Sequence, residues 1–150
     1  MSGSIRAALP QDTHILWSID SQASAYPWRE EQFSAACARE EASERALLIE
    51  ISGQVVGFIV YCRVLDSGDI HNIAVSPHYQ RRGLARDLLV SALDAMAVKG
   101  VTRCFLEVRR SNLAAQGLYS SMGFQVEGQR KNYYRQGAER EDALLMSKRL

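Results

Sequence analysis

Residues 69–99 constrain the fold more than any other part of the chain, because a strand pattern passes directly into a helix pattern. The segment "DIHNIAVS", residues 69–76, is followed by Pro77, which is typical of a strand that ends in a turn. From Gly83 to Lys99 the apolar residues recur at helical spacing, and Gly100 is expected to end this helix. The apolar positions are Leu84, Leu88, Leu89, Ala92, Leu93 and Met96. A strand followed at once by such a helix predicts an α/β unit.

The turn before this helix, "QRRGLA" at residues 80–85, combines small residues with positive charge. A helix N-terminus leaves its first backbone N–H groups unpaired and carries a partial positive charge. The small residues Gly83 and Ala85 allow a ligand to approach the main chain, and Arg81, Arg82 and Arg86 add charge around it. The turn therefore predicts an anion site of diphosphate size. A solvated basic helix start that binds nothing is the alternative, since the stretch matches neither GxxxxGK[ST] nor GxGxxG.

The rest of the chain predicts a mixed sheet in one domain, residues 1–150. Strand patterns occupy residues 4–9, 45–51, 54–65, 102–109, 124–134 and 141–150, and helical patterns occupy residues 13–22, 28–42 and 111–123. Ser52-Gly53 is a hairpin turn signal, and the polar segment "RQGAERED", residues 135–142, predicts a mobile loop in the last hairpin. Strand–helix–strand units in the second half favour an α/β sheet with both parallel and antiparallel pairing.

Composition excludes several classes of function. The net charge of +1 gives no general attraction to nucleic acid, and no apolar run reaches membrane-spanning length. The three cysteines lack CxxC spacing, and the three histidines lack metal-ligand spacing, so neither a disulfide framework nor a metal site is predicted. We expect a cytoplasmic protein that binds neither nucleic acid nor membrane. Cys37 and Cys62 have no adjacent histidine, and Cys104 falls on the strand face opposite Glu107, which argues against a covalent acyl-cysteine route.

Several motifs together resemble one known family. "QRRGLA" is similar to the pyrophosphate loop of the GCN5-related N-acetyltransferases (GNAT), with Ala85 where many members have a second glycine. "YPW" at residues 26–28, "NIAVSPHYQRRGLAR", "LEVRRSNLAAQGLYSSMGF" and "RKNYY" followed by "REDALLM" resemble the bacterial ribosomal-protein-alanine acetyltransferases (RimI type) over nearly the whole chain. The resemblance implies a mixed sheet of about seven strands flanked by about four helices, with a splayed pair of parallel strands.

The resemblance also implies acetyl-CoA as the acetyl donor. Its pyrophosphate would rest on the amides of residues 81–86, a range that includes Leu84. Its pantetheine arm would follow the main chain of Ile73, Ala74 and Val75, and Asn112 would contact the arm while also capping the helix that follows. Core packing of the strand residues is compatible with this role, because main-chain binding leaves their side chains free.

Two residues are matched by the resemblance to catalytic roles. Strand alternation places Glu107 on the face opposite Cys104, Leu106 and Val108. A carboxylate there serves as a salt-bridge partner or, as the family implies, as the general base for an amine whose unperturbed pKa is about 7.7–8.0. Tyr119 either packs beside Leu118 and Phe124 or, as the family implies, acts as general acid toward the CoA thiolate.

The acceptor implied by the resemblance is a protein N-terminus, in particular the N-terminal alanine of a small-subunit ribosomal protein. Tyr26, Trp28, Tyr133 and Tyr134 would line its groove, although sheet packing explains "NYY" equally well. Lysine side chains or small-molecule amines are the alternative acceptors. A non-catalytic CoA-binding domain is a third reading, against which the presence of both Glu107 and Tyr119 argues. A nucleic-acid module is disfavoured by the near-zero charge.

Overall fold

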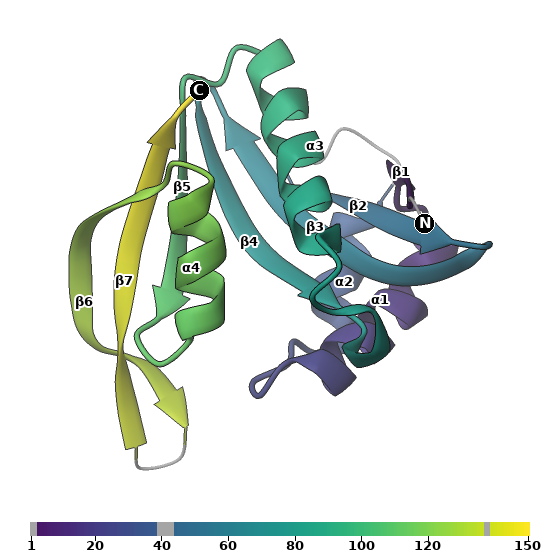
Figure 1. The fold of residues 1–150 in the computed structure, drawn as a ribbon, viewed down its shortest axis with the longest axis horizontal. Helices are drawn as coiled ribbons and strands as arrows, with labels where there is room; N and C mark the ends of the chain where they lie inside the picture. The colour runs from purple at the N-terminus through teal and green to yellow at the C-terminus, as the bar shows by residue number, and fades with distance from the viewer. Residues whose placement is uncertain (1–2, 39–43, 137–138) are drawn as a thin grey trace.

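The computed structural model describes residues 3–38, 44–136 and 139–150. Within these residues it contains seven strands and four α-helices in the predicted order β-α-α-β-β-β-α-β-α-β-β. The elements are β1 Ser4–Ala7, α1 Thr13–Ala23, α2 Glu30–Ala36, β2 Glu44–Ile51, β3 Gln54–Val64, β4 Ser67–Val75, α3 Leu84–Val98, β5 Arg103–Arg109, α4 Leu113–Ser121, β6 Gln125–Gln136 and β7 Glu139–Arg149. Figure 1 shows the sheet with α3 and α4 against it. None of the helices in the described part of the chain is long and apolar enough to cross a membrane.

The strands form one mixed sheet in the order β1-β2-β3-β4-β5-β7-β6. Within the described residues only β4 and β5 pair in parallel, and the other neighbouring strands pair antiparallel. The helix α3 joins the two parallel strands as a crossover, as expected for a strand–helix–strand unit. The predicted α/β class with mixed pairing and about seven strands is confirmed.

The predicted loop at residues 135–142 is wrong for the residues that the structure describes. The last two strands run on through most of this segment, with Arg135 opposite Arg140 and Tyr134 opposite Glu141. Residues 137–138 lie outside the described residues. The polar composition was misleading because β6 is the edge strand, and an exposed hairpin can alternate polar residues while its backbone is fully paired.

The parallel pair β4–β5 separates part of the way along its length. Pairing runs from Ser67 with Arg103 to Ile70 with Leu106, after which β4 continues to Val75 and β5 to Arg109. In Figure 1 the two strands diverge below this point, with α4 beside β5. The splayed strands therefore leave an opening in the middle of the sheet, next to the start of α3.

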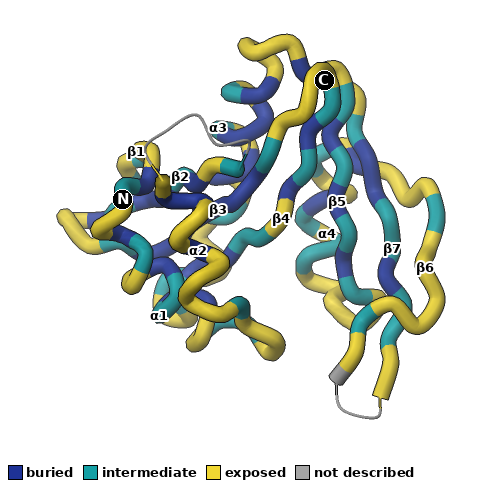
Figure 2. Tube along the Cα trace, turned by 180° about the vertical axis from the view of Figure 1, so that it is seen from behind, coloured by how far each residue is buried: buried dark blue, intermediate teal, exposed yellow. Residues whose placement is uncertain are grey.

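Two apolar cores hold the sheet from opposite faces. On one face α3 and α4 cover a core that includes Leu88, Leu89 and Met96, all fully buried. On the other face α1 and α2 cover a smaller core around Phe33 and Phe58, whose rings meet edge to face. Figure 2 shows that the buried residues are concentrated on the inner strands of the sheet, whereas the edge strand β6 is mostly exposed. The six apolar positions predicted for α3 are all buried.

Candidate active site

The turn into α3 has the backbone shape of an anion site. Gly83 is the residue before the helix and adopts a left-handed conformation with φ of 80°, and Arg81 is left-handed as well, with φ of 63°. A non-glycine residue in this region is uncommon and is concentrated at functional sites. A Cβ on Gly83 would meet nothing within 4 Å, so the space in front of the turn is open. The unpaired amides at the start of α3 face a position where an anion can bind.

A cleft of about 870 Å³ runs from this turn into the opening between β4 and β5. It brings together most of the residues predicted from the sequence, although they come from five separate parts of the chain. Those that line it are Tyr26, Ile73, Ala74, Val75, Arg81, Gly83, Leu84, Ala85, Arg86, Glu107, Asn112, Tyr119 and Tyr134. The cleft is therefore lined both by the glycine turn before α3 and by the Glu107 carboxylate with the phenols of Tyr26, Tyr119 and Tyr134.

Three of the predicted residues are not among those that line the cleft. The guanidinium of Arg82 turns back on its own loop, where it donates to the His78 carbonyl at 3.2 Å and lies over the Tyr79 ring. Trp28 packs on Phe33 with ring centroids 5.1 Å apart. Tyr133 is half exposed and meets Tyr134 edge to face. The side chain of Arg82 therefore packs on its own loop, that of Trp28 packs in the core, and that of Tyr133 packs within the last hairpin.

Asn112 and Gln80 each anchor a segment of backbone that lines the cleft. The Asn112 side chain accepts a hydrogen bond of 3.1 Å from the Ala115 amide, as predicted for a cap of α4. The Gln80 side chain donates to the Val75 carbonyl at 3.0 Å and so ties the turn to the end of β4. Gln80 was part of the predicted motif, but its side-chain contact was not foreseen.

Glu107 occupies the face of β5 that the alternation predicted, since Cys104, Leu106 and Val108 are all buried on the opposite face. Its side chain is 26% exposed, and its Oε1 lies 3.5 Å from the Arg130 guanidinium. A carboxylate that is only partly buried, and paired at the long end of the ion-pair range, keeps oxygen lone pairs free to accept a proton. Glu107 thus makes an ion pair, as expected for a salt-bridge partner, and it also lines the cleft.

Tyr119 is 6% exposed and packs against Phe124, with ring centroids 5.8 Å apart. Burial raises the pKa of its phenol well above the usual range, and the neighbouring Tyr134 and Cys104 add to the effect. Burial likewise raises the pKa of Tyr134 to about 12, with a further contribution from the negative charge of Glu107. Both phenols are therefore protonated at neutral pH and can donate hydrogen bonds into the cleft.

The structure places His71 beside Cys62, which corrects the expectation that Cys62 has no adjacent histidine. The pairing of β3 with β4 shifts register between Val60 and Tyr61, so that His71 has no partner residue across the pair. Its Nε2 lies 3.5 Å from the Cys62 Sγ, and its Nδ1 lies 2.5 Å from a Glu44 carboxylate oxygen. The sequence carried no signal for this cluster, because a register shift decides which side chains meet. His71 lines the cleft, whereas Cys62 is not among the lining residues.

Asp20 and Arg109 are two further residues that sequence reasoning missed. Asp20 is buried and accepts hydrogen bonds from the Ser24 hydroxyl, the Trp28 amide and the Asn72 side chain. Arg109 lines the cleft two residues after Glu107 on the same strand face. Within the described ranges no group of three or more His, Cys, Asp or Glu side chains is arranged to hold a metal ion.

The splayed sheet, the glycine turn and the cleft between them are the architecture of an acetyltransferase. Residues 11–124 match the sequence profile of the Acetyltransferase (GNAT) family, and the chain belongs to this family. The ribosomal protein bS18-alanine N-acetyltransferase of Escherichia coli (strain K12) is 39% identical over 138 residues, which cover 91% of this chain and 90% of that protein. The enzyme of the same name from Haemophilus ducreyi is 32% identical over 146 residues, which cover 95% and 97% of the two chains.

Solved structures agree with the sequence comparison. The crystal structure of the ribosomal-protein-S18-alanine N-acetyltransferase from Escherichia coli superposes with a TM-score of 0.90 at 35% identity, over 99% of this chain and 94% of that one. Arabidopsis thaliana NAA60, solved in complex with a bisubstrate analogue, superposes with a TM-score of 0.87 at 17% identity, over 99% and 98% of the chains. The second similarity shows a shared fold. The resemblance to the GNAT family, and to its ribosomal-protein-alanine branch, is confirmed.

Proposed function

We propose that the chain transfers an acetyl group from acetyl-CoA to the N-terminal α-amine of a protein. The observation that carries this proposal is that a single cleft joins the turn before α3 to Glu107 and Tyr119. A donor lying along the cleft has its anionic end at the turn and its thioester near the two side chains. The open space at Gly83 and the positive charges of Arg81 and Arg86 fit a diphosphate.

Beyond the last paired residues, β4 offers free backbone groups to the pantetheine arm. Residues 73–75 are paired on one side with β3, whereas the pairing of β4 with β5 on the other side ends at Ile70. Amides in the arm can bond to these backbone groups, as an added strand bonds to a sheet edge. Asn112, across the cleft, contacts the same arm while it caps α4.

Transfer occurs by direct attack of the acceptor amine on the thioester. Glu107 acts as general base and removes a proton from the amine, directly or through a water molecule. Tyr119 acts as general acid, because its phenol stays protonated and can donate to the departing thiolate. A covalent acyl-cysteine step is not needed, since Cys104 is buried on the opposite face of β5 from Glu107 and burial raises the pKa of its thiol to about 12.

The acceptor is the N-terminal alanine of a small-subunit ribosomal protein in the cytoplasm. The names of the relatives from Escherichia coli and Haemophilus ducreyi support this assignment. In the structure, Tyr26 and Tyr134 reach the Glu107 end of the cleft from the connection between α1 and α2 and from β6. Phenol rings there can grip an extended peptide at a low cost in side-chain entropy.

The test compares three acceptors at equal concentration with purified protein and acetyl-CoA. The first is a peptide with a free N-terminal alanine, the second is the same peptide blocked at its N-terminus and carrying one lysine, and the third is a panel of small amines. Mass spectrometry locates the acetyl group, and thiol release gives the rate. We expect modification of the free alanine amine. Acetylation of lysine or small amines alone would overturn the assigned acceptor, and no thiol release with any acceptor would overturn the transferase activity.

A further inference from the structure

Arg109 lies between the two aromatic side chains that reach the acceptor end of the cleft. Its Cζ is 3.5 Å from the centroid of the Tyr26 ring and 4.1 Å from the centroid of the Tyr134 ring. The two tyrosines come from distant parts of the chain, one from the connection between α1 and α2 and the other from β6. A planar guanidinium can interact with a ring on each of its faces. Arg109 therefore links two segments on opposite sides of the opening between β4 and β5.

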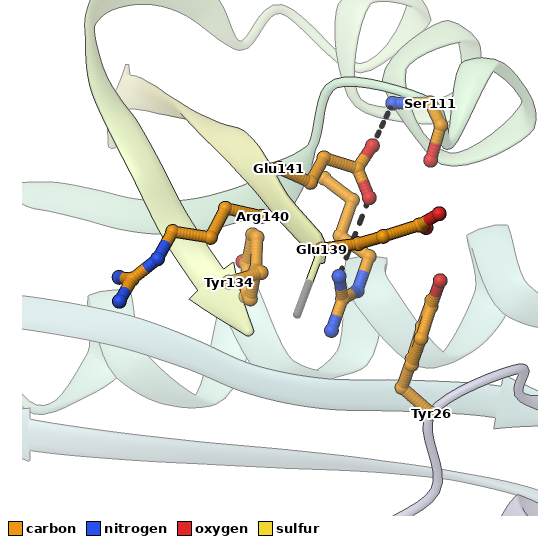
Figure 3. A pocket seen from close by; sticks show the side chains of 7 residues that line it. Tyr26, Ser111, Tyr134, Glu139, Arg140 and Glu141 are labelled. Carbon is orange, nitrogen blue, oxygen red and sulfur yellow. Dashed lines mark hydrogen bonds and ion pairs between the residues drawn. The ribbon is translucent and has the colours of Figure 1, made fainter. Parts of the chain in front are cut away.

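A carboxylate from the last strand holds Arg109 in this position. Glu141 on β7 accepts from the Arg109 guanidinium at 3.3 Å and from the Ser111 amide at 2.6 Å, as the dashed lines in Figure 3 show. Hydrogen bonds from Ser111 hold the pKa of Glu141 below its usual range, with a smaller contribution from Arg109. The carboxylate is thus ionised at neutral pH and fixes both the guanidinium and the start of the loop that leads to Asn112.

These residues surround a second, smaller pocket next to the cleft. The pocket has a volume of about 320 Å³ and shares Tyr26, Arg109, Ser111 and Tyr134 with the cleft. Figure 3 shows Tyr26 and Tyr134 on its two sides, with Glu141 between the hairpin and Ser111. Among the cation–π contacts of the described residues, Arg109 makes the one pair that reaches both of these rings.

We propose that Arg109 is a positioning residue that holds Tyr26 and Tyr134 at the spacing the acceptor peptide requires. The proposal rests on the proposed function, since it assigns a role within the acceptor groove. Arg109 acts through the two rings and takes no part in proton transfer. Loss of Arg109 raises the KM for the acceptor, because Tyr26 and Tyr134 are then no longer held in place and must be ordered when the peptide binds. The KM for acetyl-CoA changes little, because the turn before α3 lies at the other end of the cleft.

Two substitutions separate the stacking role of Arg109 from its charge. Arg109→Met removes both, whereas Arg109→Lys keeps a positive charge for Glu141 and loses the planar group between the rings. Arg110→Lys is the matched control, because Arg110 is the next residue, is 62% exposed and pairs with Gln129 and Asp142. Thermal unfolding and acetyl-CoA binding by calorimetry establish that each variant is folded.

We expect the KM for a peptide with an N-terminal alanine to rise about tenfold in Arg109→Met, which is the loss in affinity expected when two cation–π contacts are removed. In Arg109→Lys the KM should rise nearly as much. Arg110→Lys should match the parent. The substitution Tyr26→Leu should add little in the Arg109→Met background, since the two residues act through one contact. Full recovery of the KM in Arg109→Lys, or an unchanged KM in Arg109→Met, would overturn the proposal.

Hydrogen exchange of residues 24–29 tests the same link without an acceptor. Exchange should rise in Arg109→Met and stay at the parental level in Arg110→Lys, although neither substitution lies near this segment in sequence. If the parent acetylates no acceptor while exchange responds as expected, the proposed function fails and the link stands. If the parent acetylates the peptide and neither the KM nor the exchange changes, the proposed role of Arg109 fails and the function stands.

Discussion

The Asn72 side chain of β4 donates a hydrogen bond of 3.2 Å to the carboxylate of Asp20 on α1. The same carboxylate accepts from the Trp28 amide at 2.8 Å and from the Ser24 hydroxyl at 2.6 Å. Asp20 is 1% exposed, so its charge is buried but is satisfied by three donors. It therefore holds the connection that carries Tyr26 against the strand that lines the cleft.

Replacement of Asp20 by Ala should destabilise the fold and weaken acceptor binding. Buried donors left without a partner cost about 1–3 kcal/mol, so we expect a lower free energy of unfolding by this amount. The KM for the acceptor should rise as well, because the backbone on either side of Tyr26 loses its anchors. Urea unfolding and steady-state kinetics measure the two effects. Asp94→Ala, at an exposed position of α3, is the control and should change neither.

Glu107→Gln tests the general base. We expect kcat at neutral pH to fall by about 10²–10⁴-fold, with acetyl-CoA binding retained. The difference in kcat between Glu107→Gln and the parent should become smaller as the pH rises past about 8, because an N-terminal amine then loses its proton to solvent. Glu127→Gln is the control, since Glu127 accepts hydrogen bonds from Arg103 on β5 and Ser147 on β7. Equal rates for Glu107→Gln and the parent at every pH would remove Glu107 from the mechanism.

Gly83→Glu tests the anion site. A side chain here occupies the open space before α3, is strained at φ of 80° and places a negative charge where a diphosphate is proposed to bind. We expect the affinity for acetyl-CoA to fall by at least about tenfold, or ~1.4 kcal/mol, in calorimetry. Gly53→Glu is the control, because Gly53 has nearly the same conformation as Gly83, with φ of 79°, and also faces open space, at the turn between β2 and β3. Similar losses of affinity in the two variants would show that backbone strain alone is responsible.

Tyr119→Phe tests the general acid. Turnover should fall by about 10²-fold while acetyl-CoA binding is nearly unchanged, because the phenyl ring keeps its packing on Phe124. The raised pKa of Tyr119 means that its phenol stays protonated over the usual assay range, so the alkaline side of the pH profile should be the same in parent and variant. Tyr61→Phe, at another buried tyrosine, is the control. Parental turnover in Tyr119→Phe would exclude the assigned role.

The three cysteines should differ in their reaction with an aromatic disulfide reagent. Cys37 and Cys104 are fully buried, whereas Cys62 is partly exposed beside His71. Burial, and to a lesser extent the charges of Asp69 and Glu44, raise the pKa of Cys62, so its reaction should still accelerate above pH ~8.5. One thiol should react in the native protein, and none in Cys62→Ala until it is unfolded. Rapid modification of Cys104 in the folded state would contradict the structure.

Much of the fold could be predicted because its signals are local. The helical spacing of apolar residues located α3 and its buried face, and period-two alternation assigned Glu107 and Cys104 to opposite faces of β5. The turn motif before α3 was recognisable because its chemistry is carried by consecutive amides around Gly83. The polar end of the last hairpin was misjudged, because exposed strands lack the apolar signal on which the prediction depends.

The sequence by itself determined the order of the elements, the core faces of α3 and β5 and the residue types at the turn before α3, since each depends on neighbours along the chain. Only the tertiary structure decided which distant side chains meet. One such feature is the separation of β4 from β5 after Ile70 and Leu106, beyond which β5 stays paired with β7 while β4 stays paired with β3. The contact of Arg109 with Tyr26 and Tyr134 depends on the α1–α2 connection, the end of β5 and strand β6 meeting beside that opening. Such contacts are set by the packing of whole elements, and local patterns do not encode them.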